Sequence, residues 1–178
     1  RGRNCDECTV PVIGSAVSGV AAAASPAATH IARERDPGIS AADAGGRLTV
    51  NGYGVGGLGF YTLEFEDGSS ARAVCVQADV GHSLTARYTL DAEPAVSSPE
   101  LSYLLWRYAG VEAAVSDVEA AALNVLSWRY SAAQRRGGGP VWTGDAVEIA
   151  VAGGGRRADV EAAVARLAME AAARRGPW

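Results

Sequence analysis

The sequence predicts an α+β domain: an antiparallel β-sheet or sandwich with a packed helical pair and a C-terminal helix. Residues 47–90 contain short strand-like runs separated by glycine turns, whereas residues 99–130 and 158–174 have the apolar spacing of helices. Hydrophobic residues make up 48% of the 178 residues, which is enough apolar material for one core.

A hairpin is the clearest signal in the strand-rich half. Asp67 and Gly68 lie between two strand-like runs, residues 60–66 and 71–78. Asp-Gly in this position favours a tight turn between antiparallel strands. A further strand is expected over residues 83–90, because strand-like residues resume there after a glycine.

Two helices are predicted from the capping residues at their N-termini. Ser98 suits an N-cap, and Pro99 suits the first position of the helix that follows. Ser116 and Glu119 have the spacing of a capping box, which predicts a second helix over Asp117–Tyr130. This second helix is apolar almost all round, so it should be buried.

The last part of the chain is expected to return to the sheet and then end in a helix. Residues 141–151 look extended, and residues 158–174 combine an apolar side with charges four residues apart. The Gly-Pro-Trp that follows is a helix-stop signature, so further domains are expected after residue 178.

Residues 1–30 differ in composition from the rest, and residues 1–46 are predicted to be a leader and a linker. Two arginines, a weakly apolar stretch and a run of small residues up to about residue 28 resemble a secretory signal peptide. A flexible alanine-rich leader, or a first strand or helix of the fold, are the alternatives. Residues 33–46 contain Pro and Gly breaks, which predict a linker, so residues 47–178 are expected to form the single folded domain.

Composition excludes several classes of function. The net charge is −4, and all 16 basic side chains are arginine. An acidic chain of this kind lacks the basic surface that binds nucleic acid. Without lysine, the chain can form neither a Schiff base on its own side chains nor an internal lysine isopeptide bond. No stretch reaches the about 20 apolar residues of a membrane span.

Three cysteines are present. Cys5 and Cys8 form a CxxC with no second CxxC and no histidine nearby, so a local disulfide or an incidental pair is favoured over a zinc or redox site. Cys75 lies on the second hairpin strand, where alternation places it opposite Val74 and Val76. An unpaired cysteine in an exported protein calls for an explanation, either burial or chemistry.

One polar residue interrupts the buried helix. Asn124 stands alone between alanine, leucine and valine residues. A buried amide without partners costs a few kcal/mol, roughly, so Asn124 must either form hydrogen bonds or react.

Three segments together resemble the thioester domains of Gram-positive, especially actinobacterial, cell-surface proteins. Ala73-Val-Cys75-Val resembles the family's strand with the thioester cysteine. Glu100-Leu-Ser-Tyr-Leu-Leu-Trp-Arg-Tyr108 resembles the leucine-rich helix that follows it. Asp117-Val-Glu-Ala-Ala-Ala-Leu-Asn-Val-Leu-Ser-Trp128 resembles the helix with the family's Gln-x-x-x-Trp motif. Their order and spacing cover about residues 50–130.

The resemblance implies a secreted or cell-surface adhesion module without a cofactor. In that family the cysteine thiol attacks a glutamine carboxamide, ammonia leaves, and the resulting internal thioester acylates an amine of a host or surface protein. Cys75 would be the nucleophile and Asn124 the amide, with Gln77, Trp128 and Tyr103 as supporting residues.

The sequence departs from the family at the amide. Asn124, four residues before Trp128, stands where the family has glutamine, and its side chain is one methylene shorter. Either the two backbones approach more closely than in the family, or the cross-link does not form and the site is altered or inactive. Gln77 and Gln134 are the other amides close in sequence, but Gln77 shares a strand with the cysteine and Gln134 lies beyond the helix.

Three other possibilities remain open. A cysteine hydrolase would use Cys75 with His82 and Asp79, and a metal site would use Asp79, His82 and Asp91. A non-catalytic structural or ligand-binding surface module is the third possibility. In that module the aromatic residues form the core and Asn124 is hydrogen-bonded to the backbone.

Overall fold

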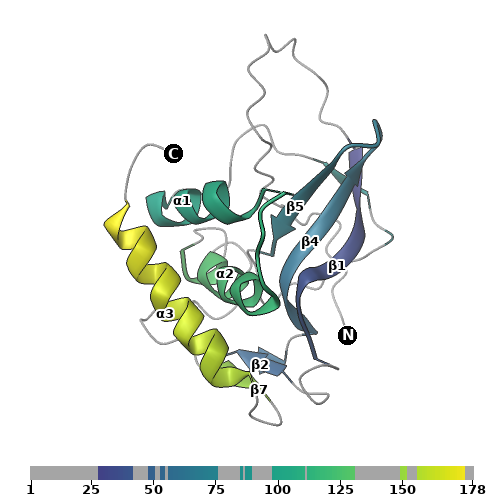
Figure 1. Cartoon of the computed structure of the whole chain (residues 1–178). Coiled ribbons are helices and arrows are strands. Elements are labelled where there is room, and N and C mark those ends of the chain that lie inside the picture. Colours follow the sequence, from purple (N-terminus) through teal and green to yellow (C-terminus); the bar gives the residue numbers. More distant parts are fainter. Residues whose placement is uncertain are drawn as a thin grey trace.

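The computed structural model describes residues 28–41, 48–50, 53–54, 56–75, 85, 87–89, 98–110, 112–130, 149–151 and 156–174. An antiparallel sheet lies on one side of the described structure and three helices lie on the other, with the middle helix against the sheet (Figure 1). The predicted α+β class is confirmed.

The main sheet has four strands in the order β5-β4-β1-β6. They are β1 (Ala28–Ser40), β4 (Gly57–Phe65), β5 (Ser70–Val74) and β6 (Tyr88–Thr89). A small sheet in the order β3-β2-β7 is made of β2 (Leu48–Val50), β3 (Tyr53–Gly54) and β7 (Ile149–Val151). The helices are α1 (Pro99–Tyr108), α2 (Asp117–Tyr130) and α3 (Arg157–Ala173).

Strand β1 corrects the predicted linker and the expected start of the fold at residue 47. Residues 33–40 belong to β1, which pairs with β4 on one side and β6 on the other. The Pro and Gly that suggest a linker lie where the register with β4 shifts, between Glu34 and Gly38. A bulge tolerates proline because its main-chain nitrogen needs no partner there.

The predicted hairpin is confirmed. β4 and β5 pair from Glu64 opposite Ser70 to Phe60 opposite Val74. Gly68 has φ +80°, a conformation that glycine adopts without strain. Of the expected strand over residues 83–90, Tyr88–Thr89 forms β6, whereas Thr85 lies in a turn and Arg87 lies outside the strand. Of the expected strands over residues 141–151, only β7 lies within the described residues.

Both predicted helix starts are confirmed. The Ser98 hydroxyl accepts a hydrogen bond from the Leu101 N–H at 3.3 Å. At α2, the Ser116 hydroxyl accepts from the Glu119 N–H at 3.2 Å, and the Glu119 carboxylate accepts from the Ser116 N–H at 3.2 Å. This reciprocal pair is the capping box that the spacing predicts.

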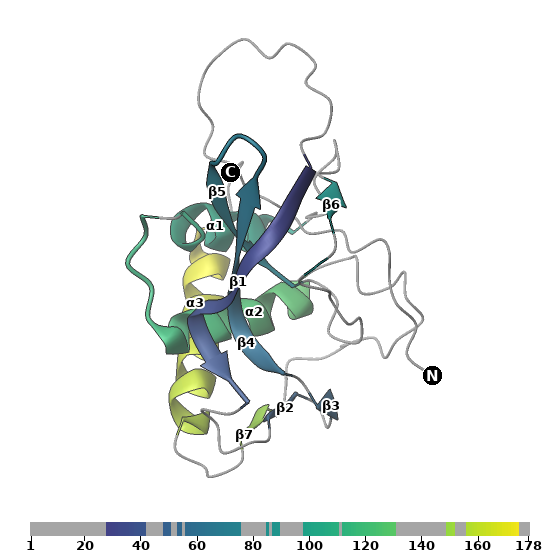
Figure 2. The ribbon, with the colours of Figure 1, turned by 90° about the vertical axis from the view of Figure 1, so that its right-hand side faces the viewer.

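Helix α2 forms the centre of the molecule, between the sheet and α3, with α1 beside both helices (Figure 1). Every residue from Ala120 to Trp128 is buried. Turned by 90°, the ribbon shows the strands in front of α2 (Figure 2). The helix is therefore covered on the sheet side and on the α3 side, which explains its apolar circumference.

The sheet has apolar clusters on both faces. Phe60 and Val74 pack with the helices. Their strand neighbours Tyr61 and Ala73 pack in a separate cluster with Ile31, Leu63 and Tyr88, which we call the outer-face cluster. Because neighbouring residues of a strand point to opposite faces, this cluster lies on the sheet face turned away from α2.

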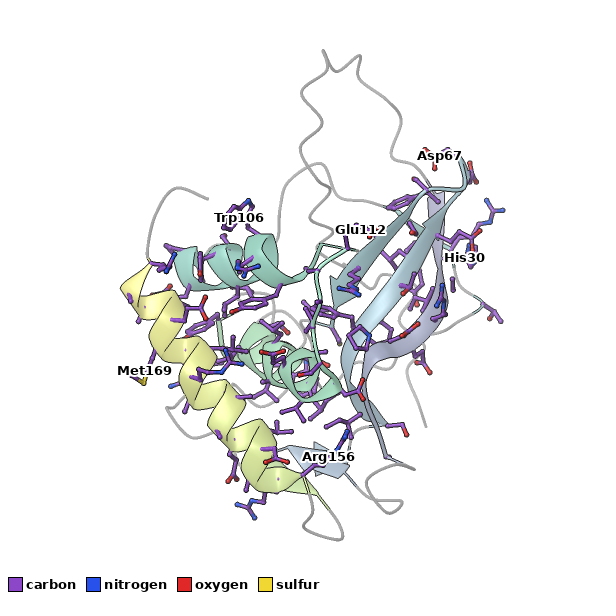
Figure 3. The ribbon with its side chains drawn as sticks, in the orientation of Figure 1. His30, Asp67, Trp106, Glu112, Arg156 and Met169 are labelled. Atoms are coloured by element: carbon purple, nitrogen blue, oxygen red, sulfur yellow. The ribbon has the colours of Figure 1, made fainter. Side chains whose placement is uncertain are left out.

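Among the residues with a described burial, two large apolar side chains are exposed. Trp106 is 57% exposed on α1 and Met169 is 75% exposed on α3, and both point away from the core (Figure 3). Within the described residues, no helix has both the length and the apolar character needed to cross a bilayer.

Candidate functional site

The structure brings the side chain of Asn124 to the main chain of Cys75. Asn124 is 1% exposed, in the middle of α2. Its Nδ2 donates a hydrogen bond to the carbonyl oxygen of Cys75 at 3.1 Å. Its Oδ1 accepts from the N–H of Gly59 at 3.2 Å. One carboxamide thus connects the helix to the adjacent strands β4 and β5.

The register of the hairpin explains why these two main-chain groups are available. Phe60 and Val74 are the last paired residues of β4 and β5, so Gly59 and Cys75 would form the next pair. Near the turn, the Phe65 N–H donates to the Ser69 carbonyl. Hydrogen-bonded pairs alternate along an antiparallel ladder, which makes Gly59 and Cys75 a hydrogen-bonding pair as well. The Asn124 carboxamide bonds to the N–H of Gly59 and to the carbonyl of Cys75, and so joins these two positions across the strands.

Ser127 adds a second donor at the same carbonyl. Its hydroxyl lies 2.8 Å from the carbonyl oxygen of Cys75 and 2.7 Å from the main-chain oxygen of Asn124. The hydroxyl has one proton and can donate to either oxygen. It also lies 3.5 Å from Asn124 Nδ2, so the two side chains form a small polar group inside an apolar helix. Ser127 is fully buried, and its hydrogen bonds offset the cost of that burial.

The side chain of Cys75 points away from this polar group. Cys75 directly follows Val74, which faces the helices, and it packs against the outer-face cluster on the other side of the sheet. The cysteine is partly buried. The carbonyl of Cys75 therefore faces α2 while its thiol lies on the opposite face of β5.

The two aromatic residues predicted to support the site are core residues. Trp128 is buried with Ile39 and Leu58 of the sheet. Tyr103 is buried in the helical core, and its hydroxyl donates to Glu170 of α3 at 2.6 Å.

The Glu170 carboxylate also accepts a hydrogen bond from a second tyrosine hydroxyl. Glu170 is therefore the centre of a polar contact between α1 and α3. The Tyr108 hydroxyl donates to its other oxygen at 2.8 Å. Burial pushes the pKa of Glu170 up, but the two phenol hydrogen bonds and the charges of Arg166 and Arg174 outweigh burial and hold this pKa below its ordinary value. The hydrogen bond to Glu170 raises the pKa of Tyr103. The group ties the two helices together as an ionised carboxylate and two neutral phenols.

Several candidate residues lie outside the described residues, namely Cys5, Cys8, Gln77, Asp79, His82, Asp91 and Gln134. The structure therefore says nothing of a hydrolase arrangement around His82. Within the described part of the chain, no group of three or more potential metal ligands occurs.

The sequence analysis missed Gly59 and Ser127. Both had a signal. A glycine inside a strand often marks the close approach of another group, and Gly59 has φ +145°, a conformation that other residues rarely adopt. Ser127 lies three residues after Asn124, a spacing that places both on one side of a helix.

Comparison with known proteins found no match. No protein-family model, no curated protein and no solved structure matches this chain. The geometry around Cys75 and Asn124 and the resemblance of the three sequence segments are therefore the observations that bear on function.

Proposed function

We propose that this chain is an exported surface-adhesion module of the thioester-domain type in which the Cys75–Asn124 pair is a structural tie and forms no internal thioester. One observation carries the proposal: the strand with the cysteine and the helix with the amide lie against each other, but the amide is hydrogen-bonded to main chain at both ends.

The adjacency supports the thioester-domain type. Residues 75 and 124 are 49 positions apart in sequence, and Asn124 Nδ2 lies 3.1 Å from the carbonyl oxygen of Cys75. The strand, the leucine-rich helix and the buried helix are the segments on which the resemblance rests. Export is supported by the composition of residues 1–28 alone.

The hydrogen bonds argue against the acyl-transfer step. Loss of ammonia from Asn124 would remove the donor to the Cys75 carbonyl, and attack at its carboxamide carbon would disturb the acceptor for Gly59. Buried groups that lose a partner cost about 1–3 kcal/mol each. The thiol also packs on the sheet face opposite the helix. A shorter side chain than glutamine makes the approach of the thiol harder still.

Intact-mass measurement of the purified protein tests the proposal. The unfolded protein should have the mass of its sequence, with Cys75 open to alkylation and no effect of prior methylamine treatment. An internal thioester would instead lower the mass by that of one ammonia (about 17 Da) and would shield Cys75 until methylamine opened the bond. That result would overturn the structural tie and favour covalent adhesion.

A Cys75→Ala variant provides the matching binding test. In a non-covalent adhesin, the variant and the original protein should bind immobilised extracellular proteins equally, and both should be released by denaturant. Binding that depends on Cys75 and survives denaturant would contradict the proposal.

A further inference from the structure

We propose that Asn124 and Ser127 form a latch on the carbonyl oxygen of Cys75 and that this latch controls how readily the thiol of Cys75 reacts. The proposal goes beyond the adhesion function and rests on its unreacted thiol. The latch consists of the two hydrogen bonds from α2 to the Cys75 carbonyl, at 3.1 Å and 2.8 Å.

The latch acts at the end of the hairpin ladder. The last paired residues of β4 and β5 are Phe60 and Val74, so Cys75 lies one position beyond the described pairing. Strand ends fray more easily than strand centres because fewer main-chain hydrogen bonds hold them. Here side chains of a central, buried helix supply hydrogen bonds to the residue one position beyond the described pairing. They attach Cys75 to one of the most buried elements of the fold.

The carbonyl and the thiol of Cys75 lie on the same residue but meet different surroundings. The carbonyl is held by α2, while the side chain packs against the outer-face cluster, next to Ala73 on the same strand. A thiol reacts as the thiolate and must be accessible to the reagent. Release of the carbonyl lets the strand end move away from the cluster without unfolding of the rest of the sheet. Local opening of the latch therefore exposes the thiol.

Ser127 is a positioning residue in this arrangement. Its hydroxyl is fully buried and can donate its one proton either to the Cys75 carbonyl or to the main-chain oxygen of Asn124. Replacement by alanine removes one donor from the latch and keeps the helix, because the α2 main chain does not depend on this hydroxyl. Asn124→Asp, as the carboxylate, removes the other donor and retains an oxygen that accepts from Gly59.

The experiment measures the alkylation rate of Cys75 by N-ethylmaleimide in the native protein. Arg72 and Arg87 bracket Cys75, and the chain has no lysine, so trypsin releases residues 73–87 with this cysteine alone. Ser127→Ala should increase the rate on the order of tenfold, the effect of losing one buried hydrogen bond on a local opening. Ser127→Thr keeps the hydroxyl and should retain the original rate.

Ser116→Ala is the matched control, since it weakens the cap of the same helix without touching Cys75. The latch predicts an unchanged alkylation rate in this variant. Equal rates in Ser127→Ala and the original protein would overturn the proposal, and so would an equal increase in Ser116→Ala. If Ser127→Ala does not fold, Asn124→Asp gives the same comparison, and an unaltered rate there also overturns the latch.

The outcome separates the latch from the proposed function. An internal thioester would leave Cys75 unreactive even in the unfolded protein and would remove the mass of one ammonia, which contradicts the proposed function itself. A protein of unaltered mass whose Cys75 alkylates at the same rate in all variants contradicts the latch alone.

Discussion

The carboxamide nitrogen of Asn124 lies 3.1 Å from the main-chain carbonyl oxygen of Cys75. This contact joins the centre of a buried helix to the end of a hairpin strand. It gives the one polar residue that interrupts the apolar run of α2 a structural role. With the Gly59 N–H on its oxygen, the amide is paired on both sides, as a buried amide must be.

Replacement of Asn124 by leucine should destabilise the protein by about 2–4 kcal/mol, because the Gly59 N–H and the Cys75 carbonyl would both lose a buried partner. Leucine has the same number and branching of side-chain heavy atoms and is not smaller, so a cavity is not the cause. The free energy of unfolding from urea denaturation measures the effect. Asn124→Ala should be at least as destabilised. If the leucine variant were as stable as the original protein, the amide would be filling space and its hydrogen bonds to Gly59 and Cys75 would contribute nothing to stability.

The features that the sequence predicts correctly are those set by interactions between residues close together in the chain. The starts of α1 and α2 depend on Ser98 and Ser116, whose partners lie three residues away, and both were predicted correctly. The Asp67-Gly68 turn is equally local. The meeting of helix and strand at Asn124 and Cys75 was expected only from the resemblance, because no local pattern encodes a contact over 49 positions.

Strand β1 shows what local reasoning cannot give. Its sequence is polar and contains Asp-Pro-Gly, which is typical of a linker. The strand forms because β4 and β6 pair with it on its two sides. The side chains of Ile31 and Ile39 are also buried, each in a different apolar cluster. Strand formation of this kind depends on tertiary context more than on propensity.

Replacement of Gly59 by alanine should cost more than replacement of Gly68. Both glycines have positive φ, +145° and +80°. At Gly68 nothing lies within 4 Å of an added Cβ, so Gly68→Ala should cost about 1 kcal/mol through the turn conformation alone. At Gly59 the strain is joined by displacement of the N–H that donates to Asn124, for a total of about 2–4 kcal/mol.

A double-mutant cycle distinguishes strain from the hydrogen bond. Gly59→Ala and Asn124→Leu should cost less together than the sum of their separate effects, because both remove the same contact. Thermal or urea unfolding of the three variants gives the coupling. Strict additivity would show that the Gly59–Asn124 hydrogen bond contributes nothing to stability.

Glu170 should make the stability of the fold depend on pH. Its pKa in the folded protein lies below the ordinary value, with burial opposed by the hydrogen bonds from Tyr103 and Tyr108 and by Arg166 and Arg174. A carboxyl with a lowered folded pKa stabilises the fold fully above its unfolded pKa, about 4.3, and loses this contribution as the pH falls through the lower folded value.

Glu170→Gln should therefore cost about 1 kcal/mol at pH 7, discounted for solvent screening of this half-buried group. The difference from the original protein should shrink below about pH 4. Urea unfolding at both pH values measures it. Glu161→Gln is the control, because its exposed pair with Arg157 has little effect at either pH. A constant difference between the Glu170 variant and the original protein at all pH values would mean that the phenols bind the carboxyl equally well with and without its charge.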